Sequence, residues 1–172
     1  MKNLNEKYKM DNLDDIKRFI TGGKAILTLE SKSTGRWFTF RVKKAKKDDE
    51  KSPFFVSVLV GPDNENSYSY VGTIFNNDGK LSFHLTKKST IGEDAMSYKA
   101  FRVFFDLLMV NKLNINMNVY HRGVCGRCGR TLTVPESLIT GLGPECRGLV
   151  EKHVSEIRKT KLQKLNRKLM AC

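Results

Sequence analysis

Three of the four cysteines gather in one stretch, HRGVCGRCGRTLTVPESLITGLGPEC, which covers residues 121–146. They are Cys125, Cys128 and Cys146, and His121 precedes the first of them by four residues. Sulfur and imidazole nitrogen are the ligands that zinc takes in closed, tetrahedral protein sites. We therefore expect these four side chains to bind one zinc ion.

The residues around the cysteines indicate how the chain would arrange them. In VCGRCGR the glycines let backbone amides turn inward toward two thiolates, as in a zinc knuckle. Pro144 suits the first turn of a helix and places Cys146 in that turn, where the helix dipole favours a thiolate. A knuckle followed by a ligand at a helix N-terminus is the layout of a treble clef. His121 ends the strand that enters the knuckle, so it is expected to reach the same ion.

Two other chemistries fit the cluster less well. A thioredoxin-like redox pair needs Cys-x-x-Cys at a helix start, but Gly126 and Gly129 disfavour a helix there and the third cysteine would have no role. A catalytic zinc of the deaminase type needs a general base in an H-x-E…P-C-x-x-C frame, and no glutamate stands beside His121. Glu136 and Glu145 suit the first turns of helices instead. The sequence favours a structural zinc and no enzymatic activity.

The other candidate ligands are placed less favourably. His84 faces away from the apolar residues of its predicted strand, so we expect it on the surface. His153 follows Cys146 by seven residues, about two helical turns and roughly 10 Å, which is too far for the same ion. Cys172 is the last residue and is expected to be frayed.

The string CGRCGRTLTVPES…GLGPEC resembles a family of small uncharacterised zinc-ribbon-like domains of bacteriophages and actinobacteria, typified by CxxCGRxLTxPxSxxxGxGPxC. The resemblance is specific over residues 125–146, and HRG together with GPDNENSYSYVGTI extends it to about residues 35–150. It implies zinc ligation by Cys125, Cys128 and Cys146 and an origin in a phage or mobile element. It implies no activity, so function has to be argued from charge and surface.

The chain of 172 residues carries a formal net charge of +13. A field of that size attracts nucleic acid or an acidic protein, although a high net charge also serves solubility alone. No apolar run approaches the roughly 20 residues of a membrane helix, and the polar start MKNLNEKYKMDNLDDIKRF is not a secretory signal. We expect a soluble, cytoplasmic protein that does not bind membranes. If a phage encodes it, the compartment is the cytoplasm of the host cell.

The first 118 residues predict a short helix followed by an antiparallel sheet with one face on a core. A short helix begins after Asp11 or Asn12 and ends at Gly22-Gly23. Period-two alternation then predicts about five strands, near residues 24–31, 37–43, 54–60, 68–74 and 81–85. The residues expected to share a face within a strand are Phe38, Phe40 and Val42; Phe54, Val56, Val58 and Val60; Tyr68, Tyr70, Gly72 and Ile74; and Leu81, Phe83 and Leu85.

Two more helices and a strand follow. Residues 97–112 form a helix capped by Ser97 that covers the sheet, and a short strand at 115–121 leads into the cysteines. Between the cysteines a brief helix is expected at 137–140, with Thr133 as its cap. The side chains expected to be buried are Tyr98, Phe101, Phe104, Phe105 and Leu108 on the covering helix, and Leu132, Leu138, Ile139 and Leu142 around the brief one.

From Pro144 onward the chain predicts a single helix to residue 170, roughly 40 Å long. Cations suit a helix C-terminus, so a solvated helix end is one interpretation. The other is a basic arm that lies on phosphates or docks Leu162, Leu165 and Leu169 against a partner. Membrane-surface binding lacks aromatic anchors. The cations of the arm are Arg158, Lys159, Lys161, Lys164, Arg167 and Lys168.

Two further basic sets are candidates for contact with a partner. Arg122, Arg127 and Arg130 surround the knuckle, where they either neutralise a zinc with three thiolates or contact phosphates. Trp37, Arg41 and Lys43, joined by Phe55, point outward from strands. An aromatic among basic residues on strands is typical of single-stranded nucleic-acid binding, although a lone Trp at a strand start also occurs at a core edge.

These observations together predict an α+β protein with a sheet domain at 1–118, a treble-clef-like zinc module at 119–150 and a basic helix at 144–172. We expect a non-enzymatic, phage-encoded accessory protein that binds nucleic acid. The alternative is an inhibitor that binds an acidic host protein, such as a defence or transcription component. A nucleotide-binding protein is a weaker alternative, because GLGP at 141–144 is already explained by the zinc site.

Overall fold

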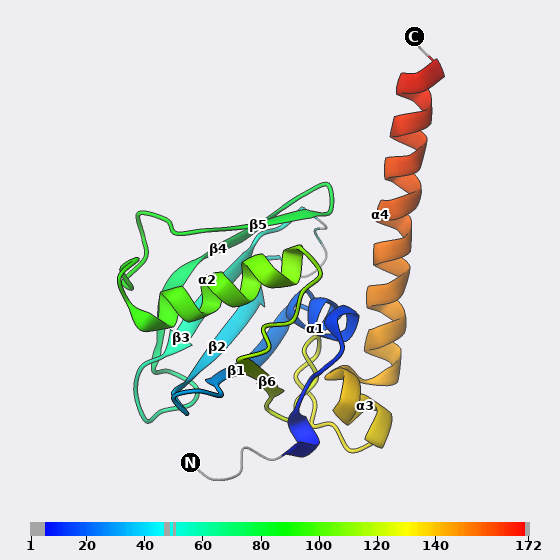
Figure 1. The fold of residues 1–172 in the computed structure, drawn as a ribbon. Coiled ribbons are helices and arrows are strands. Elements are labelled where there is room, and N and C mark those ends of the chain that lie inside the picture. The colour runs from blue at the N-terminus through cyan, green and yellow to red at the C-terminus, as the bar shows by residue number, and fades with distance from the viewer. Residues whose placement is uncertain (1–5, 47–48, 50, 171–172) are drawn as a thin grey trace.

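The computed structural model describes residues 6–46, 49 and 51–170 and has the α+β architecture that the sequence predicts. A single sheet of six antiparallel strands lies beside a cysteine-containing segment, and a long C-terminal helix extends beyond the rest of the molecule (Figure 1). The helices are the 3-10 turn η1 (Glu6–Tyr8), α1 (Leu13–Ile20), α2 (Met96–Met109), α3 (Pro135–Thr140) and α4 (Pro144–Met170). The strands are β1 (Lys24–Ser31), β2 (Trp37–Lys44), β3 (Phe54–Leu59), β4 (Tyr68–Asn77), β5 (Lys80–His84) and β6 (Met117–His121).

The sheet is a meander whose last strand returns to its first. The strand order is β5-β4-β3-β2-β1-β6, so each of the first four strands pairs with the next one along the chain, and β5 and β6 lie at opposite edges. The short strand expected before the cysteines is β6, which pairs with β1 from Leu27↔His121 to Ser31↔Met117. Because β6 is paired along its whole length with β1, the segment that follows it starts from a fixed position.

Helices α1 and α2 bury one face of the sheet. Asn12 caps α1 by accepting a hydrogen bond from the backbone N–H of Asp15, as the sequence suggested. On α2, the Phe101 ring packs between Phe40 and Phe83, at centroid distances of 5.0 and 4.9 Å. The expected cap of α2 is wrong: Ala95 takes that position without a side-chain hydrogen bond, and Ser97 is buried in the first turn.

A β-bulge changes the expected alternation in β4. The register between β3 and β4 shifts at Val56/Ser57, so Val56 pairs with Gly72 while Ser57 pairs with Tyr70. Val71 is the extra residue, and it is fully buried in the core. Tyr68 and Tyr70 therefore lie on the opposite face from Gly72 and Ile74, which corrects the prediction that all four share one face.

The face of the sheet opposite the core carries exposed aromatic rings. Trp37, Phe55 and Phe75 are 40%, 44% and 39% exposed. The strand register places all three on the side away from Phe40 and Val56. Phe55 pairs with Thr73 of the neighbouring strand, two residues from Phe75, whereas Trp37 lies at the far end of β2.

The Phe19 side chain of α1 joins the sheet to the cysteine segment. Its ring is fully buried and lies against the backbone of Gly126 and Gly141, and the His121 ring is 6.0 Å away. Any side chain at either glycine would overlap that ring, because a Cβ atom would come within 2.5 Å of it at Gly126 and within 2.6 Å at Gly141. Glycine is thus required at both positions because the Phe19 ring lies directly against the backbone there.

This packing predicts that Gly126→Ala destabilises the protein. The added methyl group has to displace the buried Phe19 ring or the loop backbone, which typically costs about 1–3 kcal/mol of unfolding free energy. Gly148→Ala is the matched control, because a Cβ atom there meets nothing within 4 Å. In its helix the control should be neutral or gain up to about 1 kcal/mol. Urea denaturation of both variants measures this, and equal stability of the two would contradict the packing argument.

Candidate metal centre and basic cleft

The first two cysteines lie in a tight hairpin built on backbone hydrogen bonds. Val124 and Thr131 form an antiparallel bridge, and the N–H of Cys125 donates to the carbonyl of Arg130 at 2.8 Å. The N–H of Gly129 donates back to the Cys125 carbonyl at 2.9 Å, with φ of +82° at Gly129. Only a residue that tolerates this left-handed conformation closes the turn without strain. The hairpin therefore has the glycine-dependent geometry expected of a knuckle.

Helices α3 and α4 bring the third cysteine to the hairpin. Helix α3 ends at Gly141, whose φ of +70° is the left-handed cap typical of a helix C-terminus. Pro144 then begins α4, so Cys146 lies in its first turn as predicted. Two details differ from expectation. Val134 is the cap residue of α3 instead of Thr133, and no side chain bonds there.

Burial around α3 also differs at one residue. Leu132, Leu138 and Leu142 are buried as expected, but Ile139 is 63% exposed. A helix this short buries one side only, and Leu138 and Thr140 occupy the buried positions.

The three thiol groups are positioned to bind a metal ion. The sulfur atoms of Cys125, Cys128 and Cys146 all lie within 4.8 Å of one another. Tetrahedral zinc with Zn–S bonds of about 2.3 Å needs sulfur atoms roughly 3.8 Å apart. That separation lies within the observed limit, so the donor set fits a thiophilic ion. Such an ion would link the hairpin to the start of α4.

Ionisation of the three thiols is unequal. Burial opposes ionisation of Cys125, but the backbone N–H groups of Cys128, Gly143 and Arg127 lower the pKa of its thiol to about 7. The N–H of Gly143 is 3.5 Å from that sulfur. Burial and the neighbouring sulfurs of Cys128 and Cys125 raise the pKa of Cys146 to about 11. A bound cation would favour the thiolate at each position, since metal coordination deprotonates thiols.

His121 does not join the thiols, so the prediction of it as the fourth ligand is wrong for this structure. The N–H of Gly123 donates to its Nδ1 atom at 2.9 Å, and its Nε2 atom donates to the Leu138 carbonyl at 2.7 Å. With 2% exposure, packed edge-on against the Tyr8 ring, it is a buried structural residue. Burial is the main cause that lowers the pKa of His121, so the ring is neutral at pH 7.

The other candidate ligands and acids take the positions that the sequence suggested for them. His84 is exposed on β5, with its ring 5.8 Å from that of Phe75. His153 is on α4 and lines a cleft away from the thiols. Glu136 forms an ion pair with Arg147 at 2.8 Å, joining α3 to α4. Cys172 lies outside the described residues.

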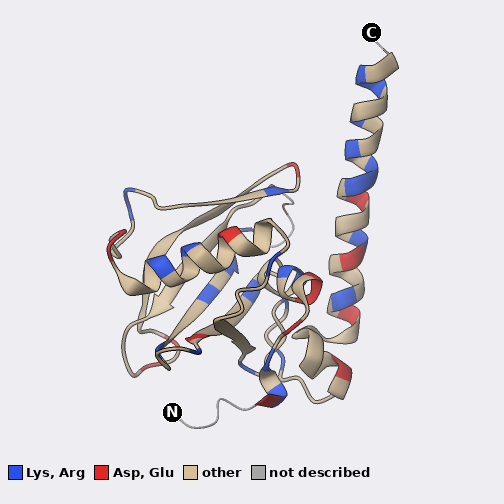
Figure 2. Ribbon diagram, in the orientation of Figure 1, with Lys and Arg blue, Asp and Glu red and all other residues tan. Residues whose placement is uncertain are grey.

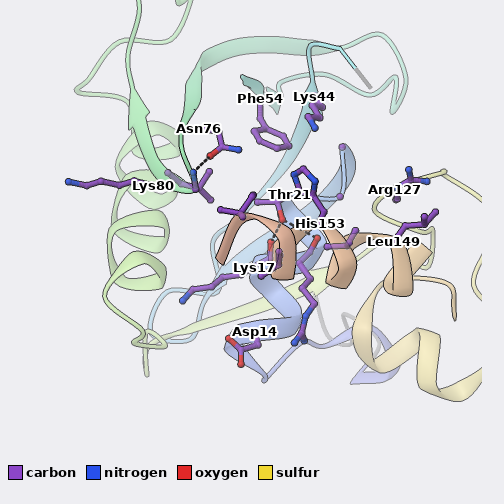
Figure 3. Close-up of a pocket in the computed structure, with 18 of the residues that line it drawn as sticks. Asp14, Lys17, Thr21, Lys44, Phe54, Asn76, Lys80, Arg127, Leu149 and His153 are labelled. Atoms are coloured by element: carbon purple, nitrogen blue, oxygen red, sulfur yellow. Dashed lines mark hydrogen bonds between the residues drawn. The ribbon is translucent and has the colours of Figure 1, made fainter. Parts of the chain in front are cut away.

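A cleft of about 1000 Å³ lies between α4 and the neighbouring end of the sheet. Cations from six parts of the chain line it: Lys17 and Arg18 on α1, Lys24 at the start of β1, Lys43 and Lys44 at the end of β2, Lys80 at the start of β5, Arg127 of the hairpin, and Arg158 and Lys161 on α4. Figure 3 shows side chains from α1, the strand ends and α4 around this space. Within the described residues that line it, Asp14 is the single acid.

Arg127 is the one knuckle arginine that faces the cleft. It is partly buried there, while Arg122 and Arg130 are exposed elsewhere on the hairpin. The structure therefore does not bring the three arginines together on one surface of the cleft.

The second half of α4 is a solvent-exposed basic rod. Every residue from 158 to 170 is exposed, and the six cations predicted for the arm all lie in this half. The acids of α4 lie in its first half, as the red and blue segments of Figure 2 show. Leu162, Leu165 and Leu169 are 60%, 55% and 68% exposed on the same rod.

The sheet residues proposed for partner contact divide into two groups. Lys43 is exposed at the cleft and Trp37 is exposed at the far end of β2. Arg41 is already engaged, because its guanidinium lies 4.0 Å from the centroid of the Tyr68 ring and donates to the Glu65 carbonyl. Sequence alternation did not indicate Tyr68 as its partner, because the bulge in β4 puts that ring on this face.

Residues 117–150 match a family of unknown function, DUF6011. The matched segment contains β6, the cysteine hairpin, α3 and the first turns of α4, which is the region the sequence motif pointed to. No curated protein and no solved structure matches the chain. None of the described helices combines the length and apolar character that crossing a membrane requires.

We expect one zinc per chain and loss of the metal on Cys128→Ser, because removing one of three thiolates leaves too few ligands. His121→Gln should retain the metal, since its ring nitrogens bond to backbone groups instead. Elemental analysis of purified protein measures both. If the His121 variant lacks zinc while circular dichroism shows that it is folded, the histidine is a ligand after all.

The buried neutral imidazole also predicts a pH dependence. Because the pKa of His121 is lower in the folded than in the unfolded protein, the unfolded state binds the proton more readily. Stability is therefore lost as the pH falls below about 6.5. The unfolding free energy of wild type should approach that of His121→Gln between about pH 7.5 and 5. A difference independent of pH in denaturant titrations would contradict this.

Proposed function

We propose that the protein is a non-enzymatic accessory protein that binds nucleic acid and holds a structural zinc at Cys125, Cys128 and Cys146. The carrying observation is the exposed, acid-free run of cations on residues 158–168 of α4. Phosphate backbones bind such arrays through counterion release, largely without regard to sequence. The cleft beside α4 supports the proposal, because cations from other elements line it together with Arg158 and Lys161 of the helix.

The zinc would have an anchoring role. Its ligands come from the hairpin at Cys125 and Cys128 and from the first turn of α4 at Cys146. Helix α4 makes few contacts of its own with the body, since Val150 is its only buried residue within the described part of the chain. A metal crosslink at its base would fix the direction of the basic arm. The phage origin implied by the sequence motif belongs to this proposal.

The exposed leucines favour a second candidate, an inhibitor of an acidic host protein. Leu162, Leu165 and Leu169 follow one another at helical spacing on the arm and are more than half exposed. Phosphates gain nothing from these side chains, whereas a protein groove would bury them. Substituting Leu165 and Leu169 with Ser should leave nucleic-acid affinity unchanged and abolish a protein complex.

The nucleic-acid proposal predicts salt-sensitive binding by the zinc-loaded protein. Fluorescence anisotropy with labelled single- and double-stranded DNA and RNA, at about 50 and 200 mM salt, measures it. Lys159→Glu combined with Lys168→Glu should weaken binding and reduce the slope of log K against log salt by about 2. Lys99→Glu combined with Lys112→Glu on and after α2 changes the net charge equally and is the control. No binding to any of these nucleic acids would favour the protein partner.

A further inference from the structure

The cleft beside α4 is lined by several cations that have no acidic partner in the described part of the chain. Lys24, Lys43, Lys80 and Arg127 make no ion pair with an acid in the described part of the chain, although all of them line this space. Like charges held around a shared cavity repel one another unless an anion lies between them. The cleft therefore has the electrostatic character of an anion site.

Helix α4 forms one side of the cleft, and it contacts the rest of the molecule at its base and again farther along. At the base, Arg18 is 3.8 Å from Glu151. Farther along, the tip of the β4–β5 hairpin touches the helix, because Gly79 is packed against Ile157 and Asp78 lies 3.6 Å from Lys164. Arg158 and Lys161 lie between Ile157 and Lys164 on the helix. Both line the cleft, together with the cations at the end of the sheet.

The cleft continues onto the exposed aromatic face of the sheet. Lys43 lines the cleft and pairs across the strands with Phe55, and Phe55 pairs with Thr73. Phe75 lies two residues beyond Thr73 on the same face, beside the ring of His84. Adjacent strands are about 4.8 Å apart, so Phe55 lies one strand and Phe75 two strands away from Lys43 at the edge of the cleft.

We propose that the cleft binds the phosphodiester backbone of single-stranded nucleic acid, whose bases stack on Phe55 and Phe75 where the strand leaves the cleft. The inference rests on the proposed function and adds to it a site and a strand specificity. A volume of about 1000 Å³ is at the upper end for a small-molecule pocket and has room for a segment of a chain. A duplex offers phosphates to the cations but keeps its base faces stacked inside, so it cannot use the two rings.

The experiment compares variants of the full-length, zinc-loaded protein. Lys44→Glu combined with Lys80→Glu changes the cleft, and Phe55→Ala changes the aromatic path. The control is the pair at Lys99 and Lys112, which carries the same charge change. The arm pair at Lys159 and Lys168 lies outside the cleft and is compared with the cleft pair, because the proposed function predicts that it weakens binding as well. The probes are a labelled oligothymidylate of about 12 nucleotides, its duplex form, ATP and inorganic polyphosphate. Circular dichroism and zinc content verify that each variant is folded.

For the single strand we expect the cleft pair to weaken binding at least about tenfold more than the Lys99 and Lys112 control. Phe55→Ala should cost at least about fivefold, the lower limit for loss of one stacked base. The duplex should bind more weakly and be insensitive to Phe55→Ala. Photocrosslinking of a strand that carries 5-iododeoxyuridine should label the peptide containing Phe55.

Three outcomes would overturn the inference, and they differ from failure of the proposed function. If the cleft pair and its control lose the same affinity for the single strand, or if only the arm pair loses affinity, the protein binds nucleic acid but the cleft is not the site. Equal binding of the duplex with the same dependence on Phe55 would remove the strand specificity. ATP or polyphosphate that competes fully while Phe55→Ala has no effect would assign the cleft to free polyphosphates. Absence of all nucleic-acid binding in wild type would instead refute the proposed function itself.

Discussion

The close approach of Phe19 to two glycines is the contact on which the arrangement of this molecule depends. The ring belongs to α1, which is part of the sheet core, yet it rests on the backbone of Gly126 and Gly141 in the cysteine segment. The carbonyl of Gly126 also accepts a hydrogen bond from Lys24 at the start of β1. Buried contacts of this density tolerate little displacement. The sheet and the thiol cluster are therefore one packed unit.

The direction of α4 follows from that unit. Cys146 in its first turn is held beside the hairpin thiols, and the hairpin is fixed in turn by Phe19. The helix then passes the open end of the sheet, touching it again at Gly79. A cleft flanked by cations is the result, since the strand ends of an antiparallel sheet and one side of the helix face each other. The charge of the chain is thus concentrated by its topology.

Much of the fold and part of the site were predictable from local pattern. The capping Asn12, the left-handed Gly141 and the first-turn Pro144 each act within a few residues, so the sequence indicates the elements they bound. The three cysteines were predictable because knuckle and helix start are local motifs. The role of His121 was not, because its choice between a metal and backbone partners depends on Leu138, which is distant until α3 packs. Tyr68 was misplaced because a bulge depends on the partner strand.

By itself, the sequence determined the α+β class, the thiol cluster and the excess of positive charge, since composition, periodicity and short-range turn chemistry encode them. Tertiary structure alone decided that β6 joins the sheet edge and that Lys44, Lys80 and Arg127 meet in one cleft. These three residues lie far apart along the chain, and no local rule relates them. Only the packing of Phe19 on the hairpin and the line of α4 place their charges around the same space, because the relative position of elements is set by burial between them.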